Sequence, residues 1–184
     1  QRLALQKARI DEFLQNKFGS QVPLEDKGIQ NGKAVWAAPD LVEDGTWSNT
    51  VLPGVWEGQG WEMLDGIVWF RKEVLLTEAQ ASQAATLGLA MIDDSDEAWI
   101  NGIKVGGLRS SYNVVRSYEV PVGVLRPGKN VIAVRVEDTG YGGGFHGKPE
   151  LLYLRTAAGE ISLAGDWKMK VGKALGSLPG TQDN

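Results

Sequence analysis

An Asn-Gly pair at positions 101 and 102 constrains the fold of this chain more than any other feature. It stands between two short strand-like segments, Ala98-Trp99-Ile100 and Ile103-Lys104-Val105. Asn and Gly readily adopt the two positive φ values that a type I′ turn requires, so the pattern predicts a tight β-hairpin. Residues 68–75 place Val68, Phe70 and Val74 on one face and Trp69, Arg71 and Glu73 on the other, which is typical of a half-buried strand. The chain is therefore expected to build antiparallel sheet.

Further short strands separated by turns are expected along the rest of the chain. They fall at residues 87–92, 118–122, 131–137, 151–155, 161–163 and 167–171, with a turn at 126–130. About eight or nine short strands with regular turns are typical of a β-sandwich. We therefore expect an all-β fold.

The beginning of the chain carries the one helical pattern. Residues 2–18 place apolar side chains at a period near 3.6 residues, and Gly19 can end the helix. We expect this helix to be peripheral. Residues 20–45 are rich in Gly, Pro and Asp and predict an irregular lead-in segment.

Composition excludes several classes of function. The net charge of -4 and the pI near 5.1 provide no basic surface for nucleic acid. No apolar run approaches the roughly 18 residues of a membrane span. The absence of cysteine excludes disulfides, thiolate zinc sites and a cysteine nucleophile. A length of 184 residues fits one domain, and the start at Gln1 indicates a fragment or a processed product.

A glycine-rich loop surrounds the single histidine of the sequence. Residues 142–148 match nucleotide-loop spacing, but Pro149 follows where such a loop needs Ser or Thr and a helix. His146 would have to be the base of a Ser-His hydrolase, yet the sequence contains no Gly-x-Ser-x-Gly elbow. No carboxylate pair is singled out for glycosidase chemistry. We expect no catalytic residue in this chain.

The acidic run at residues 93–97 has two interpretations. Asp93, Asp94 and Asp96 are candidates for a calcium site, although their spacing is not that of an EF-hand. The alternative is a turn between strands in which these carboxylates cap backbone amides. No other cofactor or metal is expected.

Seven tryptophans are a high number for one domain. Four are expected to fill the core of the sandwich and its ends: Trp47, Trp69, Trp99 and Trp167. The other three lie in glycine-rich, loop-like contexts: Trp36, Trp56 and Trp61. Each of these three either packs in the core or forms a plate that stacks on a sugar ring.

Several segments in a fixed order resemble a known family. They lie at residues 52–57, 65–72, 92–96, 100–102, 128–136, 138–140 and 163–168. Together they resemble the galactose-binding-like β-domain inserted in bacterial sialate O-acetylesterases, which are hydrolases of the SGNH family. The strand, Asn-Gly, strand piece is shared with the sugar-binding domains of family 2 glycoside hydrolases. The resemblance covers about residues 36–171.

The resemblance implies a jelly-roll sandwich that accompanies an SGNH esterase domain in the same parent chain. It divides the chain into a helix and lead-in linker at 1–35, the sandwich at 36–171 and a connecting tail at 172–184. No Gly-Gln-Ser-Asn or Gly-Asp-Ser block occurs, and Gly143 stands where an Asp-x-x-His pair would need Asp. This chain would thus be a non-catalytic, carbohydrate-binding-like accessory domain, and the family implies a periplasmic or secreted location.

The partner implied by the family is an acetylated or sialylated glycan, bound by loops at one end of the sandwich. The candidate contact residues are Trp56, Asp94, Arg116, Tyr141, Phe145 and His146. Aromatic rings would stack on sugar, Asp94 would accept from hydroxyls, and Arg116 would pair with a sialic acid carboxylate. Two alternatives stay open: a structural insert that shapes the esterase active site without binding sugar, and a sugar-binding domain of a glycoside hydrolase.

Overall fold

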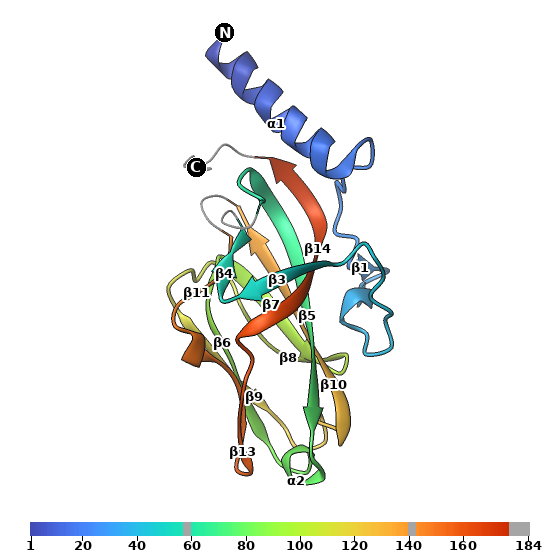
Figure 1. The fold of residues 1–184 in the computed structure, drawn as a ribbon, viewed down its shortest axis with the longest axis vertical. Helices are drawn as coiled ribbons and strands as arrows, with labels where there is room; N and C mark the ends of the chain where they lie inside the picture. Colours follow the sequence, from blue (N-terminus) through green and yellow to red (C-terminus); the bar gives the residue numbers. More distant parts are fainter. Residues whose placement is uncertain (57–59, 140–142, 177–184) are drawn as a thin grey trace.

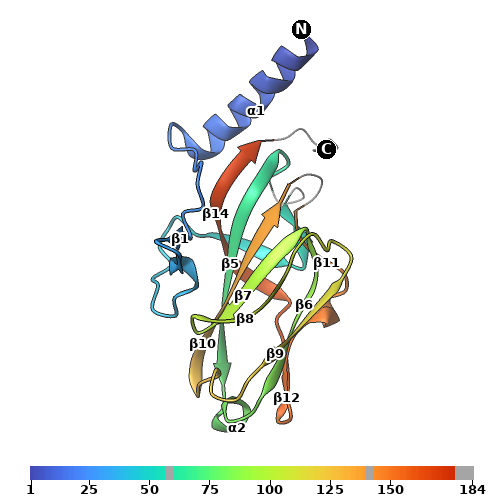
Figure 2. The same ribbon diagram turned by 180° about the vertical axis from the view of Figure 1, so that it is seen from behind.

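The computed structural model describes residues 1–56, 60–139 and 143–176 of the chain. Two antiparallel sheets pack against each other, and a long helix projects from one end of them (Figure 1 and, from behind, Figure 2). The expected all-β sandwich of the jelly-roll type, with one N-terminal peripheral helix, is confirmed.

The first sheet has the strand order β3–β14–β5–β10–β7–β8. Its strands are β3 (Ser48–Leu52), β5 (Leu64–Leu76), β7 (Ser95–Ile100), β8 (Ile103–Leu108), β10 (Gly128–Asp138) and β14 (Gly165–Gly176). The second sheet has the order β13–β12–β6–β11–β4, and β9 also pairs with β6. Its strands are β4 (Gly54–Val55), β6 (Ala85–Asp93), β9 (Val115–Val120), β11 (Gly144–His146), β12 (Leu152–Thr156) and β13 (Gly159–Ser162).

Shorter elements connect and cover these sheets. They are the pair β1 (Ile29–Gln30) and β2 (Lys33–Ala34), the 3₁₀ turns η1 (Val35–Ala37) and η3 (Pro149–Leu151), and the helix α2 (Glu78–Ala81). A capping box begins α2, because Thr77 and Gln80 each accept from the backbone N–H of the other.

The predicted hairpin joins β7 to β8. Asn101 and Gly102 have φ values of 52° and 79°, the positive pair that a type I′ turn needs. The Asn101 side chain is also buried: its Nδ2 donates to Val124 O at 3.0 Å, and its Oδ1 accepts from Val131 N at 3.0 Å. The turn residue therefore also ties the hairpin to β10.

The main core lies between the two sheets. Along β5, Val68 and Phe70 point into this core, where Phe70 meets Phe145 edge-on at 5.1 Å between ring centroids. Trp56 and Trp167 belong to the same core. Burying the apolar faces of both sheets in one layer is the main source of stability in a sandwich.

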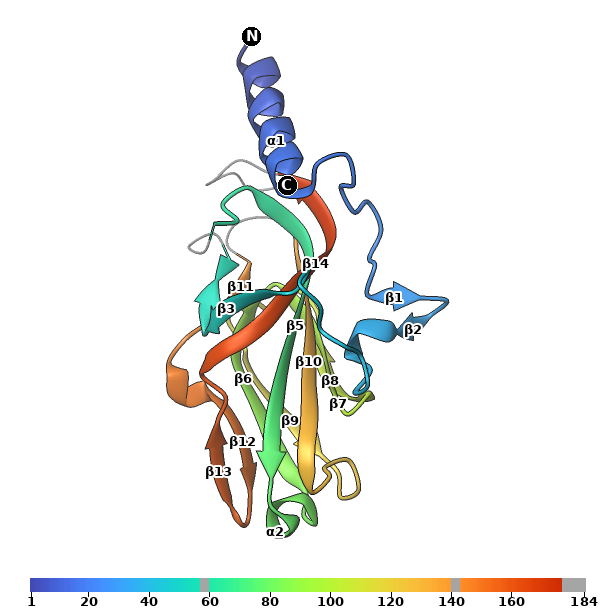
Figure 3. The ribbon, with the colours of Figure 1, turned by 45° about the vertical axis from the view of Figure 1, so that its right-hand side comes forward.

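A second apolar cluster covers the outer face of the first sheet. Trp36, Trp47, Trp69 and Trp99 form it, and the rings of Trp69 and Trp99 stack at 5.2 Å. Figure 3 shows the β1–β2 segment lying against this side of the sandwich. The expectation that Trp47, Trp69 and Trp99 fill the core of the sandwich is therefore corrected, because odd and even positions of a strand face opposite sides of the sheet.

The lead-in segment, residues 20–45, covers that cluster. Asp26 accepts from Trp69 Nε1 at 2.9 Å and from Arg135 Nε at 2.7 Å, which anchors the segment to β5 and β10. Gly28 passes so close to the sheet that a Cβ there would stand 2.2 Å from the Trp69 ring. The segment is irregular, as predicted, but it is packed rather than a free linker.

The N-terminal helix α1 (Arg2–Phe18) has the bounds that the sequence predicts and is followed by Gly19, with φ of 62°. Its C-terminal part contacts the body through Phe13, Leu14 and Phe18, which are partly buried. Its first turns project away, and Leu3 is 81% exposed (Figure 1). In the described ranges, neither α1 nor α2 has the length and apolar character needed to cross a membrane.

Some strand boundaries differ from the prediction. β14 continues to Gly176, so the segment expected as a tail at 172–184 begins as strand, and residues 177–184 lie outside the described ranges. The strands β3, β4 and β11 were not predicted, because they are short and lie beside Gly and Pro. The glycine-rich loop contributes β11, which pairs with β6 and β4.

Candidate functional site

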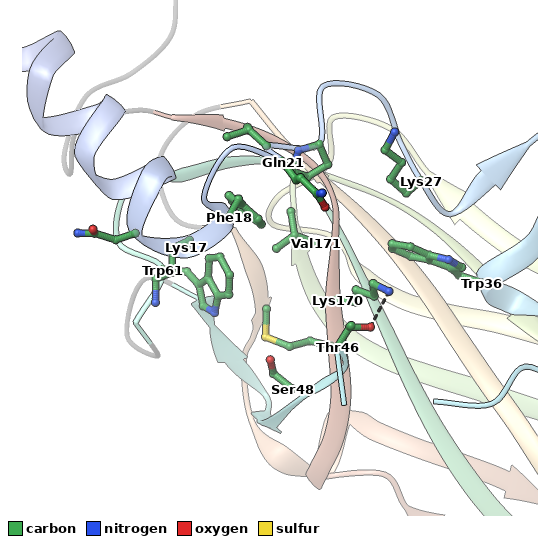
Figure 4. Close-up of a pocket in the computed structure, with 14 residues that line it drawn as sticks. Lys17, Phe18, Gln21, Lys27, Trp36, Thr46, Ser48, Trp61, Lys170 and Val171 are labelled. Carbon is green, nitrogen blue, oxygen red and sulfur yellow. Dashed lines mark hydrogen bonds between the residues drawn. The ribbon is translucent and has the colours of Figure 1, made fainter. Parts of the chain in front are cut away.

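A groove of about 810 Å³ lies between the C-terminal end of α1 and β14. Its volume falls within the range of small-molecule sites. Residues from α1, the lead-in segment, the start of β3, the loop before β5 and β14 line it. Figure 4 shows Trp61 and Trp36 on opposite sides, with Val171 and Lys170 of β14 between them.

Trp61 forms one wall of this groove. Its backbone O accepts from Leu64 N at 3.1 Å, in the turn that leads into β5. Its ring packs on Phe13 and Phe18 of α1, with centroid distances of 6.4 and 5.8 Å. The ring is only partly buried, so one part of the indole lines the open space.

Trp36 forms the opposite wall and is held from behind. Its ring meets Trp47 at 5.5 Å and Trp69 at 6.1 Å. The buried Arg71 guanidinium donates to Trp36 O at 2.6 Å and to Ala38 O at 3.0 Å, which fixes η1 on the sheet. Burial lowers the pKa of Arg71, although the nearby Glu43 carboxylate opposes this shift. Trp36 is therefore a rigid wall with 8% of its surface exposed.

Three lysines bring positive charge to the groove. Lys17 Nζ lies 4.6 Å from the centroid of Trp61, and Lys170 Nζ lies 4.8 Å from that of Trp36. Lys27 adds a third ammonium from the lead-in segment. Among the described residues, no Asp or Glu lines the groove, and none of the three lysines forms an ion pair.

Thr46 links Lys170 to a carboxylate outside the groove. Its Oγ1 accepts from Lys170 Nζ at 2.7 Å and donates to Asp44 Oδ1. The Thr46 side chain and backbone N–H lower the pKa of the exposed Asp44, with a smaller contribution from Lys170. The hydrogen bond therefore holds the Lys170 ammonium beside Thr46.

The chemistry available in the groove is binding. Aromatic faces stack on the apolar faces of flat or ring-shaped ligands, and ammonium groups attract anions. Glycoside hydrolysis needs two carboxyl groups on either side of the bond, and the described lining offers none.

The residues that the sequence analysis expected at a ligand surface lie elsewhere. Arg116 is completely buried, with its Nε 2.7 Å from Asp96 Oδ1. Its NH2 group donates to Ile92 O at 3.0 Å and to Asp94 O at 3.1 Å. Because these donors are occupied inside the fold, Arg116 cannot reach a sugar carboxylate in this structure, which corrects that expectation.

Trp56 and Phe145 are also core residues, with 1% and 0% of their surfaces exposed. Trp56 Nε1 donates to Leu64 O at 2.9 Å. The Phe145 ring packs between Phe70 and Trp167, at 5.1 and 6.1 Å. Stacking on a sugar is therefore not open to either ring as the chain is folded here.

Asp94 and His146 are partly exposed at one end of the sandwich. Asp94 Oδ2 accepts from Thr139 N and Oγ1, both at 3.3 Å. This contact fits the second interpretation of the acidic run, in which a carboxylate caps a backbone amide. His146 Nε2 lies 2.7 Å from Tyr112 O. Tyr141 falls outside the described residues. A ligand contact from Asp94 or His146 stays a prediction.

The calcium candidates are separated by the structure. Asp93 and Asp94 come together with Asp138, with one carboxylate oxygen of each within 4.8 Å of the others. Asp96 instead faces Arg116 and accepts from Tyr118 Oη at 2.6 Å. Oxygen ligands of this kind suit calcium, but Asp96 is not one of them here.

The sequence analysis predicted only some of the residues that line the groove. Trp36 and Trp61 were singled out as stacking candidates, and both line it. Its lysines were missed, because Lys17 and Lys27 stand in segments with no ligand motif. The alternation of Lys168, Met169 and Lys170 along β14 is the signal that could have marked an outward-facing positive strand.

Comparisons with known proteins indicate the class of domain to which this fold belongs. No family model matches the chain. A protein of Formosa agariphila named "Putative beta-glucuronidase" is 32% identical over 104 residues, covering 56% of this chain and 10% of that protein. The chain thus spans about a tenth of the length of the curated relative it matches.

Solved structures agree on the fold. A β-glucuronidase of Bacteroides uniformis matches 76% of this chain and 16% of its own, with a TM-score of 0.52 and 19% identity. A family 2 glycosyl hydrolase of Bacteroides cellulosilyticus matches 78% of this chain and 19% of its own, with a TM-score of 0.52 and 18% identity. The fold is that of a domain found within family 2 glycoside hydrolases. These matches give no support to the sialate O-acetylesterase resemblance.

Proposed function

We propose that this chain is a non-catalytic accessory domain of a family 2 type glycoside hydrolase and that it binds carbohydrate in the groove between α1 and β14. The observation that carries the proposal is the pair of tryptophan walls, Trp36 and Trp61, on opposite sides of that groove. Paired aromatic walls are a common way to hold sugar rings, because each ring offers a flat apolar face.

The comparisons support the glycoside hydrolase alternative over the esterase reading. The sequence relative and two of the structural neighbours are β-glucuronidases by name, and each is much longer than the region that matches this chain. The partner we propose is therefore a catalytic domain of the same parent protein, with a glucuronide or a related glycan as its substrate. The division at residues 35 and 171 and a periplasmic or secreted location stay predictions.

A second function is favoured by one specific observation. The first turns of α1 project away from the sandwich, with Leu3 81% and Leu5 67% exposed. An exposed apolar helix end of this kind suits packing against another domain. The chain would then be a structural module that supports the catalytic domain and holds no sugar itself.

Titration of tryptophan fluorescence on the isolated chain separates the two functions. We expect saturable quenching by at least one member of a panel of neutral, acetylated and acidic tetrasaccharides. The variant Trp61→Leu should lose the response while its circular dichroism spectrum stays that of the parent, since Leu keeps an apolar contact with Phe13 and Phe18. A flat response across the panel would reject the binding function and favour the structural module.

A further inference from the structure

We infer that the groove selects an anionic saccharide, and this inference rests on the carbohydrate-binding function proposed above. The chain as a whole is acidic, with 23 Asp and Glu against 19 Lys and Arg. The groove nevertheless gathers Lys17, Lys27 and Lys170, and its described lining contains no carboxylate. The local charge is thus opposite to that of the protein, which favours an anionic ligand at this place.

Each side of the groove pairs one ring with one cation. Lys17 lies over Trp61 at 4.6 Å, and Lys170 lies over Trp36 at 4.8 Å. A sugar ring that packs against either indole would bring its substituents close to an ammonium. An acidic substituent on that ring would then form a hydrogen-bonded ion pair with the ammonium, whereas a neutral sugar supplies no charge of its own to that contact.

The lysines are available for such a bond. Their ammonium groups form no ion pair with a described Asp or Glu, so an incoming anion breaks no existing salt bridge. Lys170 gives up at most a hydrogen bond to the Thr46 hydroxyl, and the hydroxyl keeps its contact with Asp44. The cation–π contacts are worth only about 0.5–1 kcal/mol each at exposed sites, so they do not prevent the change of partner.

The cavity beside β7 and β8 is less favourable for an anion, because three carboxylates line it: Asp96, Glu97 and Glu137. In the cavity beside β7 and β8, Arg135 pairs with Glu97 at 3.3 Å and Lys104 pairs with Glu97 at 3.0 Å. Those cations are already neutralised by their neighbours. The groove between α1 and β14 therefore carries the stronger case for an anion.

The test compares matched ligands by isothermal titration calorimetry. The probes are tetragalacturonate, its methyl ester, neutral cellotetraose and a sulfated galactan tetrasaccharide. We expect tetragalacturonate to bind at least about tenfold more tightly than its methyl ester, as one charge-assisted hydrogen bond predicts. Raising the salt concentration from about 50 to about 500 mM should weaken the binding of tetragalacturonate and leave the affinity for its methyl ester unchanged.

Lysine variants test whether the preference for the acidic ligand arises in the groove. The double variant Lys17→Gln, Lys170→Gln should lose at least about tenfold in affinity for tetragalacturonate and nothing for the ester. The control Lys7→Gln, Arg9→Gln removes the same two positive charges from the exposed part of α1 and should change neither affinity. If the double variant fails to fold, Lys27→Gln replaces it, because Lys27 is exposed.

Each outcome decides the inference. Binding of the sulfated tetrasaccharide supports selection by charge and adds sulfate as a second source of the anion. Equal affinity for tetragalacturonate and its methyl ester overturns the inference but leaves carbohydrate binding intact. Absence of binding by all four probes overturns the inference, and together with a flat fluorescence response to the acetylated tetrasaccharides it overturns carbohydrate binding as well.

Discussion

The buried pair of Arg116 and Asp96 makes a sharp prediction about stability. Both side chains are 0% exposed, and Arg116 Nε lies 2.7 Å from Asp96 Oδ1. The change Arg116→Met removes the cation and leaves the carboxylate inside the fold with Tyr118 Oη as its remaining side-chain donor. Removing one partner of a buried pair costs about 3–5 kcal/mol, because the other charge is left without compensation.

The same guanidinium also satisfies backbone groups. It donates to Ile92 O and Asp94 O on one side and to Ser111 O and Val114 O on the other. Arg116→Met deprives these carbonyls of a donor as well, so we expect the loss to reach the upper part of that range. Domains of this kind have only about 5–15 kcal/mol of unfolding free energy in total, so a loss of this size is a third or more of the total and should lower the urea midpoint strongly.

Urea unfolding followed by tryptophan fluorescence measures this loss as a change in midpoint at constant slope. The control is Arg155→Met, which breaks an exposed pair with Glu160 at 3.0 Å and should cost at most about 1 kcal/mol. A loss below about 1 kcal/mol for Arg116→Met would refute the reasoning, because the pair would then behave like an exposed one.

Two further predictions concern Tyr118 and Gly28. Burial and the hydrogen bond to Asp96 raise the pKa of Tyr118, so above about pH 10 the unfolded chain loses this proton while the native chain keeps it. The unfolding free energy should therefore fall as pH rises beyond that value, and Tyr118→Phe should remove this part of the slope; identical alkaline profiles would speak against the shift. Gly28→Ala should cost about 1–3 kcal/mol, because its Cβ would stand 2.2 Å from the Trp69 ring. Gly45→Ala, with open space around it, should cost nothing, and equal urea midpoints for the two variants would contradict the packed lead-in segment.

Local signals in the sequence predicted the local parts of the fold. The Asn101-Gly102 turn and the helix α1 depend on the backbone preferences of a few adjacent residues, and both are where they were expected. The sandwich followed from the number of short strands and the regular turns between them. Alternation along β5 separated its two faces, but the expectation that only one of them is buried was wrong, because Trp69 and Arg71 on the second face are buried as well.

Contacts between distant segments were not predictable in the same way. Trp69 faces outward on β5, and it is buried by Trp99 of β7 and by the lead-in segment, which contacts it through Asp26, 43 positions earlier. Arg116 has an exposed neighbour on each side in β9. The residues around it in the sequence therefore do not indicate that it pairs with the buried Asp96. The groove likewise needs α1, η1 and β14 together, so its lysines carry no motif that a single sequence reveals.

The central claim is that carbohydrate binds between Trp61 and Trp36, and the indole N–H signals of the protein test it directly. Seven tryptophans give seven probes in a nitrogen-edited NMR spectrum during titration with tetragalacturonate. We expect saturable shifts for Trp61 and Trp36 and none for Trp56 and Trp167, whose Nε1 groups donate inside the core at 2.9 and 2.7 Å. If the signals of Trp61 and Trp36 stay fixed while the ligand binds, the groove is not the site and the account is wrong.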